Sequence, residues 1–96
     1  MTNMKQYRIQ FTNGHIVVKE RESPNGTREA KCTLHTLYTP EGRYDGPPPY
    51  EPLITMLFRE VVAWADENNY THTKMLMRDG QPYFIAWVTP SQEEQQ

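Results

Sequence analysis

Few side chains in this sequence could bind a metal ion or attack a substrate. Cys32 is the single cysteine, and His15, His35 and His72 are the histidines. Cys32 and His35 are three residues apart in a predicted strand, where residues of opposite parity point to opposite faces. A structural zinc ion needs four converging ligands, so we predict no metal and no cofactor. Cys32 alternates with apolar neighbours, and we interpret it as a small core residue.

Paired carboxylates could support acid–base chemistry. Glu60 and Glu67 are two turns apart on the predicted exposed face of a helix, with Asp66 beside them. Acids are common on exposed helix faces, and a chain of 96 residues is short for a deep cleft. The five glycines lie in predicted turns and form no phosphate-binding loop. These features favour a binding protein over an enzyme.

Basic side chains gather in the first part of the sequence. Residues 1–39 carry six Lys and Arg against three acids, whereas residues 40–96 carry four against nine. Arg8, Lys19 and Lys31, with Arg28 near them, lie in predicted strands, and a basic strand surface could follow a phosphate backbone. The isoelectric point of about 5.9 is low for a dedicated nucleic-acid-binding domain. An acidic or nucleoprotein partner fits this balance better.

Residues 40–50 form a predicted exposed connection rich in proline, glycine and tyrosine. Arg43, Tyr44 and Tyr50 belong to the residue types that are enriched at interface hot spots. A proline-stiffened loop loses less entropy when it docks on a partner. The segment is therefore either a binding loop or a plain spacer.

Asn13-Gly14 is the strongest turn signal in the sequence. Between alternating apolar residues, this pair predicts a type I′ hairpin with a two-residue loop. In that register Phe11 pairs with Ile16, and Ile9 pairs with Val18. Apolar residues then fall on one face of the hairpin and basic residues on the other.

The next elements are predicted by turn residues and periodicity. Residues 23–26 (Ser-Pro-Asn-Gly) predict a second turn, and a third strand follows to about Tyr38. Pro52 suits the first turn of a helix, and apolar residues continue at helical spacing to Ala65. Asn68-Asn69 is a predicted stop because asparagine tolerates the left-handed cap.

Residues 73–88 predict a second hairpin around Asp79-Gly80. Its strands carry apolar residues on both faces, so it is either central in the sheet or covered by a partner or a second copy of the chain. The sequence thus predicts one α+β domain over residues 1–96. It has an antiparallel sheet of about five strands, in the order β-β-β-α-β-β along the chain, and one amphipathic helix packed on one face. Residues 91–96 form a polar tail.

In overall character the sequence resembles small phage-encoded inhibitors of bacterial defence, notably anti-CRISPR proteins. The resemblance rests on a short acidic domain, tight turns at Asn13-Gly14 and Asp79-Gly80, a helix at 51–69 and the lack of a catalytic set. It implies stoichiometric inhibition by docking on a large host protein or ribonucleoprotein assembly, which blocks the binding of target nucleic acid. The residues we expect to contact the partner are Arg8, Lys19, Arg28, Lys31, Arg43, Tyr44, Tyr50, Glu60 and Glu67.

Two other functions fit the same residues. One is a small accessory protein that binds RNA or DNA with the basic face of the first strands. The other is a homo-oligomeric structural or accessory subunit that associates through the 73–88 hairpin. The sequence has no signal peptide and no long apolar run, so we expect a cytoplasmic protein with no membrane partner.

Overall fold

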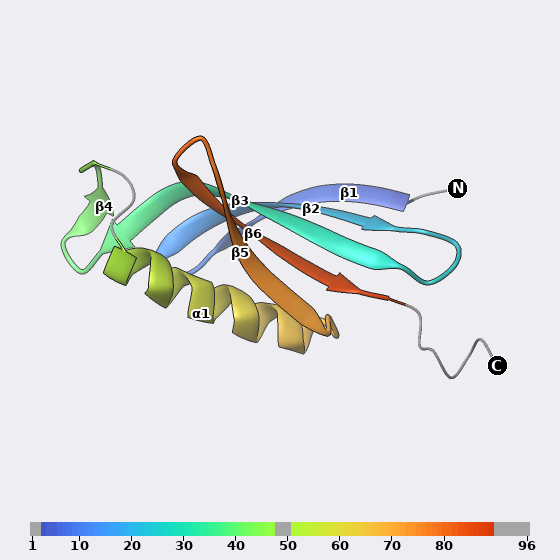
Figure 1. Cartoon of the computed structure of the whole chain (residues 1–96). Helices are drawn as coiled ribbons and strands as arrows, with labels where there is room; N and C mark the ends of the chain where they lie inside the picture. The colour runs from blue at the N-terminus through green and yellow to red at the C-terminus, as the bar shows by residue number, and fades with distance from the viewer. Residues whose placement is uncertain (1–2, 48–50, 90–96) are drawn as a thin grey trace.

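The protein forms an antiparallel sheet with one helix lying along one of its faces (Figure 1). The computed structural model describes residues 3–47 and 51–89, so the predicted tail at 91–96 lies outside the described residues. The elements are β1 (Asn3–Gln10), β2 (Gly14–Glu22), β3 (Arg28–Thr39), β4 (Gly42–Tyr44), α1 (Glu51–Glu67), β5 (His72–Arg78) and β6 (Gln81–Val88). The strand order across the sheet is β1-β2-β3-β6-β5. The predicted α+β architecture is therefore confirmed.

The segment predicted as an irregular connection, residues 40–50, contains an additional strand. Over the described residues the sheet has six strands instead of about five, because β4 turns back and pairs with residues 37–39 of β3. β6 pairs with β3 only as far as Thr33, which leaves the later part of β3 free to pair with β4. Gly42 begins β4 with a φ of 126°, a conformation that glycine adopts without a steric penalty.

The first hairpin forms, but its predicted register and turn are wrong. Ile9 pairs with Ile16, two residues away from its predicted partner. Neither Asn13 nor Gly14 has a positive φ, so the loop is not a type I′ turn. The Phe11 N–H donates instead to the Gly14 carbonyl oxygen at 2.7 Å and closes a longer loop. A shift of two residues keeps every side chain on its face, so the predicted apolar face is retained.

Contact with α1 explains why a glycine occupies position 14. A Cβ atom on Gly14 would lie 2.8 Å from Cδ2 of Leu57 and 3.0 Å from the carbonyl oxygen of Thr36. Real Cβ atoms essentially never approach another atom as closely as 2.8 Å. The glycine is thus needed for the close approach of the helix to the sheet, and not for a left-handed turn.

A bulge in β3 changes which of its residues face α1. His15 pairs with Thr36, whereas the next residue of β2, Ile16, pairs with Leu34. The extra residue in β3 reverses the alternation beyond this point. Leu37 is consequently buried, although uninterrupted alternation from Leu34 would place it on the opposite face.

The helix follows its predicted limits and buries one stripe of apolar side chains. The buried residues of α1 are Leu53, Ile54, Leu57, Val61 and Ala65. Asn69 has a φ of 67°, and the Tyr70 N–H donates to the Ala65 carbonyl oxygen at 2.9 Å. The predicted asparagine stop is confirmed, and it directs the Tyr70 side chain back into the core.

The last hairpin has its predicted turn, and one of its strands is central in the sheet while the other is at the edge. Asp79 and Gly80 have φ values of 52° and 77°, as a type I′ turn requires. β6 lies between β3 and β5, whereas β5 is an edge strand. Phe84 and Ala86 of β6 are fully buried beneath α1, and the alternate residues Tyr83, Ile85 and Trp87 point to the opposite face of the sheet.

Candidate functional site

The face of the sheet opposite α1, which we call the open face, carries alternate residues of all five long strands. The strand register arranges these residues in rows across the sheet. The middle row consists of Gln6, Lys19, Lys31, Ile85 and Lys74. Lys19 and Lys31 are direct cross-strand partners, an arrangement in which like charges repel. Among the described residues, none of the three lysines has an ion-pair partner.

The open face is strongly basic although the chain has a net charge of −2. The basic residues at its strand positions are Arg8, Lys19, Arg21, Lys31, Lys74 and Arg78, all of them exposed. Glu29 is the one acid at the corresponding positions of the described strands, and its Oε1 lies 3.7 Å from Nη1 of Arg21. This excess of positive charge makes the open face suited to an anionic ligand.

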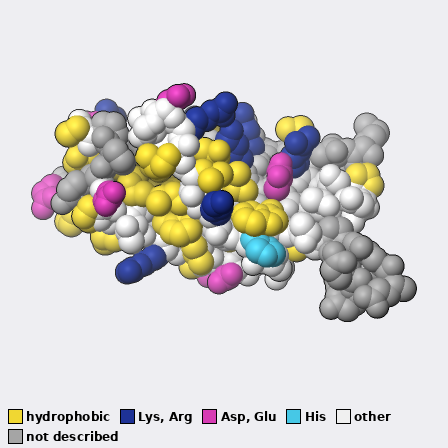
Figure 2. Space-filling view, in the orientation of Figure 1, with side chains coloured by type: hydrophobic (Ala, Val, Ile, Leu, Met, Phe, Trp, Pro, Cys, Tyr) yellow, Lys and Arg dark blue, Asp and Glu magenta, His cyan; other side chains and the backbone are white. Residues whose placement is uncertain are grey.

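A stripe of large apolar side chains on β6 crosses the basic face. Tyr83, Ile85 and Trp87 are half-buried and lie on the open face. The His72 ring stacks on Trp87, with a centroid distance of 4.9 Å and an interplanar angle of 9°. Nζ of Lys31 lies 5.3 Å from the centroid of the Tyr83 ring. Figure 2 shows Lys and Arg side chains gathered beside apolar surface on the side of the sheet away from α1.

The structure brings together some of the residues that the sequence singles out. Arg8, Lys19 and Lys31 share the open face, as their common strand face predicts. Lys74 was missed, because it lies in the other hairpin and reaches this face only through the pairing of β3 with β6. The period-2 pattern of β6 could have identified Trp87 as its neighbour, but only once the strand order was known.

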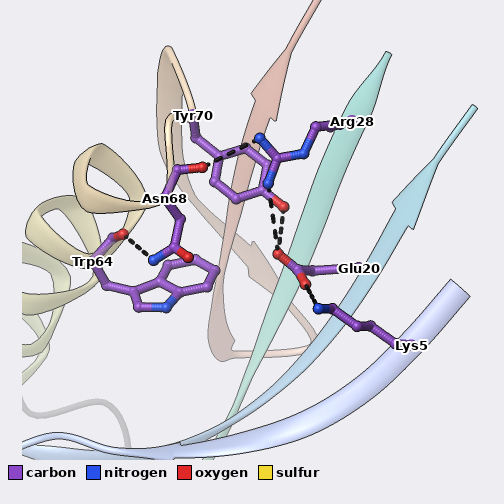
Figure 3. A network of polar contacts seen from close by, with 6 residues as sticks. All are labelled: Lys5, Glu20, Arg28, Trp64, Asn68 and Tyr70. Atoms are coloured by element: carbon purple, nitrogen blue, oxygen red, sulfur yellow. Dashed lines mark hydrogen bonds and ion pairs between the residues drawn. The ribbon is translucent and has the colours of Figure 1, made fainter. Parts of the chain in front are cut away.

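Arg28 lies on the other face of the sheet and is not part of this group. It belongs to a polar network at the C-terminal end of α1 (Figure 3), centred on the Glu20 carboxylate. Tyr70 Oη donates to Oε2 of Glu20 at 2.7 Å. Nη2 of Arg28 lies 4.0 Å from the same oxygen, and Nζ of Lys5 lies 3.6 Å from Oε1. Nη1 of Arg28 also donates to the Asn68 carbonyl oxygen at 3.2 Å. The network joins three strands to the helix end.

Burial and the nearby Glu20 carboxylate keep the Cys32 thiol and the Tyr7 and Tyr70 hydroxyls protonated. Burial raises the pKa of the Cys32 thiol to about 12, and the nearby Glu20 carboxylate adds to the increase. Burial is also the largest cause that raises the pKa values of the Tyr7 and Tyr70 hydroxyls above their ordinary value, and Glu20 adds to both through hydrogen bonding and its charge. Cys32 is 1 % exposed, which confirms that it is a core residue, and its thiol remains protonated at neutral pH.

Arg43 and Tyr44, two of the predicted binding residues of the 40–50 segment, lie on β4, which is not part of the basic rows. Nε of Arg43 is 3.0 Å from Oδ1 of Asp45. Tyr44 is half-buried against the core, and its Oη donates to the Pro47 carbonyl oxygen at 3.1 Å. Tyr50 lies outside the described residues. Arg43 and Tyr44 therefore belong to a separate structural feature at the end of β3.

Glu60 does not face water as its helix position predicts. Its two carboxylate oxygens accept hydrogen bonds from the backbone N–H groups of Thr12 and Asn13, each at 2.9 Å. Glu60 is half-buried, whereas Glu67 is exposed in the last turn of α1. The loop between β1 and β2 bends toward the helix, and its backbone donates both hydrogen bonds to the Glu60 carboxylate. Glu60 therefore has a structural role that its spacing in the sequence did not reveal.

We expect Glu60→Ala to lower the free energy of unfolding by about 1–2 kcal/mol, because two charge-assisted hydrogen bonds are lost. Urea unfolding followed by circular dichroism measures this loss. Glu67→Ala is the matched control and should change the free energy of unfolding by less than about 0.5 kcal/mol. Equal stabilities of the two variants would show that the Glu60 hydrogen bonds do not hold the loop.

Within residues 3–47 and 51–89, no group of three or more His, Cys, Asp and Glu side chains is placed to hold a metal ion. Over the same part of the chain, no helix is long and apolar enough to cross a membrane. No protein family, curated protein or solved structure matches the chain. The open face and its charges are thus the observations from which a function can be inferred.

Proposed function

We propose that this chain is a non-enzymatic binding protein that docks on a nucleoprotein assembly, with its open face against the nucleic acid. The observation that carries the proposal is the row of Lys19, Lys31 and Lys74 across the sheet. Lys19 and Lys31 are directly opposite and repel each other in the free protein, and Lys74 adds a third positive charge beyond Ile85 in the same row. A phosphate backbone lying along the row would relieve this repulsion and release its own counterions.

The opposite side of the molecule supports docking with a defined orientation. The exposed surface of α1 carries the acids Glu51, Asp66 and Glu67 against the single base Arg59. Acidic and basic groups thus face opposite directions across the sheet–helix layers. Such a charge distribution orients a protein as it approaches a partner that has both basic protein surface and nucleic acid.

Docking in this way would cover the nucleic acid and prevent it from engaging its target. This is the stoichiometric inhibition that the resemblance to anti-CRISPR proteins implies, with a large host assembly as the partner. The requirement for positive charge on the open face is shared with the simpler alternative of an accessory RNA- or DNA-binding protein. The lysine row is therefore the first feature to test.

Reversing the charge of the lysine row should abolish most nucleic-acid binding. Fluorescence anisotropy with a labelled single-stranded oligonucleotide measures the affinity. We expect Lys74→Glu to weaken binding about tenfold, and Lys19→Glu/Lys31→Glu/Lys74→Glu to weaken it by about 100-fold or more. For the wild-type protein, log K should fall with log salt concentration with a slope of about −2, as for contacts to three phosphates of a single strand.

The matched control is Arg59→Glu, which makes the same change in net charge on the exposed side of α1. It should bind within about twofold of the wild-type protein, because its charge is far from the row and screened by salt. Circular dichroism checks that each variant is folded. If Arg59→Glu weakened binding as much as Lys74→Glu, only net charge would matter and the proposed interface would be wrong.

A further inference from the structure

The apolar stripe on the open face lies outside the core of the described part of the chain. Phe84 and Ala86 already provide the contribution of β6 to the core beneath α1. Tyr83, Ile85 and Trp87 point the other way, and no described element covers them. Proteins that bind single-stranded nucleic acids combine exposed aromatic rings, on which bases stack, with basic groups that contact the phosphates. The open face carries both.

The rows place the rings on the two sides of the lysines. Trp87 is in the row of Arg21 and Glu29, and Tyr83 is in the row of Arg8 and Thr33. The lysine row lies between these two rows. Tyr83 and Trp87 are four residues apart on one strand, or about 13 Å. A backbone running along the lysines, across the strands, would have one ring available to its bases on either side.

The neighbours of the Trp87 and Tyr83 rings favour the stacking of bases on them. The ring of His72 lies almost parallel to that of Trp87, so a base that stacks on this pair would extend an existing stack. Nζ of Lys31 lies near the Tyr83 ring, where it could neutralise the phosphate of a base stacked there. The same lysine therefore connects the two modes of recognition.

The dimensions of the open face disfavour a duplex. Its five strands span about 19 Å from β1 to β5, which is wider than the major groove of about 12 Å. A duplex that lay on the face would set its hydrated phosphates against the apolar stripe, and its bases would remain paired and out of reach. A single strand avoids both costs, because its bases are free to turn toward the sheet.

We propose that the open face binds single-stranded nucleic acid, with the backbone along Lys19, Lys31 and Lys74 and with bases stacked on Trp87 and Tyr83. This inference rests on the proposed function and specifies its ligand. It adds the requirement that bases, and not phosphates alone, contribute to affinity. The requirement can be tested independently of the lysine row.

The test compares three labelled probes by fluorescence anisotropy. They are an oligothymidylate of about a dozen nucleotides, an abasic strand of the same length, and a duplex of the same length. We expect the oligothymidylate to bind at least about tenfold more tightly than the abasic strand, because stacking of one base contributes roughly that factor. The duplex should bind no better than the abasic strand.

Two variants test whether the Trp87 ring causes the difference in affinity between oligothymidylate and the abasic strand. Trp87→Ala should lose about tenfold in affinity for oligothymidylate while its affinity for the abasic strand is unchanged. Trp87→Phe should retain most of the affinity, since a ring remains. In a Trp64→Phe background Trp87 is the one remaining tryptophan, and oligothymidylate should quench its fluorescence more strongly than the abasic strand does.

The outcomes separate the two proposals. If abasic and thymidine strands bound equally and both depended on the lysines, the stacking inference would be wrong and the proposed function would stand. If the duplex bound most tightly, the ligand class would be wrong. If none of the probes bound, both the proposed function and the stacking inference would be wrong.

Discussion

Phe84→Ala is expected to lower the free energy of unfolding by about 3–5 kcal/mol. Phe84 is fully buried, and its ring stacks on Phe58 of α1 with a centroid distance of 5.5 Å and an interplanar angle of 17°. It occupies the middle of β6, with β3 on one side and β5 on the other. Truncation would leave a cavity between the helix and the centre of the sheet, where neither can easily collapse.

A loss of this size is a large part of the stability of a small domain, which is about 5–15 kcal/mol. Thermal and urea unfolding followed by circular dichroism measure it. Met77→Ala is a suitable control, because Met77 lies on the edge strand and is 54 % exposed. Its effect should be below about 1 kcal/mol. A Phe84→Ala variant as stable as Met77→Ala would contradict the packing of α1 on β6.

The second large effect is a loss of stability at alkaline pH. Cys32, Tyr7 and Tyr70 are neutral when protonated, and their pKa values are raised in the folded protein, to about 12 for Cys32. Burial is the main cause for each, and the Glu20 carboxylate adds to it. The folded state therefore holds protons that the unfolded chain releases near pH 8.5 for cysteine and pH 10 for tyrosine.

The sign follows from proton linkage. Where the unfolded chain binds fewer protons than the folded protein, the free energy of unfolding falls as pH rises. The stability is fully present below the pKa values of the unfolded chain and is lost above them. We expect a flat profile up to about pH 8 and a decline of at most about 1.4 kcal/mol per pH unit from Cys32 above about pH 8.5. A steeper decline should begin near pH 10, where the two tyrosines contribute as well.

Urea unfolding at a series of pH values measures this profile. Cys32→Ala should remove the decline between about pH 8.5 and 10 and leave the steeper part in place. Tyr70→Phe should reduce the steeper part, and it should also cost about 1–3 kcal/mol at neutral pH because the hydrogen bond to Glu20 is lost. A wild-type profile that stayed flat to pH 11 would show that these groups are not buried beside the Glu20 charge.

The sequence by itself determined the features that depend on short windows. Alternation assigned Arg8 and Lys19 to the face opposite the apolar residues, and helical spacing with Pro52 located α1. The turns at residues 23–26 and at Asp79-Gly80 also formed as predicted, since Gly26, Asp79 and Gly80 have the positive φ values that such turns require. Periodicity and turn chemistry act within a few residues, so they can be recognised without knowledge of the fold.

The Asn13-Gly14 turn shows where local signals fail. The pair predicts a two-residue turn, yet α1 packs against the loop and overrides that preference. Leu57 takes the space that a side chain at Gly14 would need, and Glu60 binds the loop backbone. Both partners are more than forty residues away along the chain. No local pattern can anticipate a contact of this kind, because its energy comes from packing the whole core.

The candidate site itself was decided by the strand order. Lys31 and Lys74 lie in the same row, on the two sides of Ile85, only because β6 pairs with both β3 and β5. The same pairing places Tyr83 and Trp87 on the basic face. Arg28 lies on the other face of the sheet, where it pairs with Glu20. The sequence determined the face of each strand on which a side chain lies. The tertiary structure decided which strands are adjacent, because that choice depends on how all the apolar faces are buried together beneath one helix.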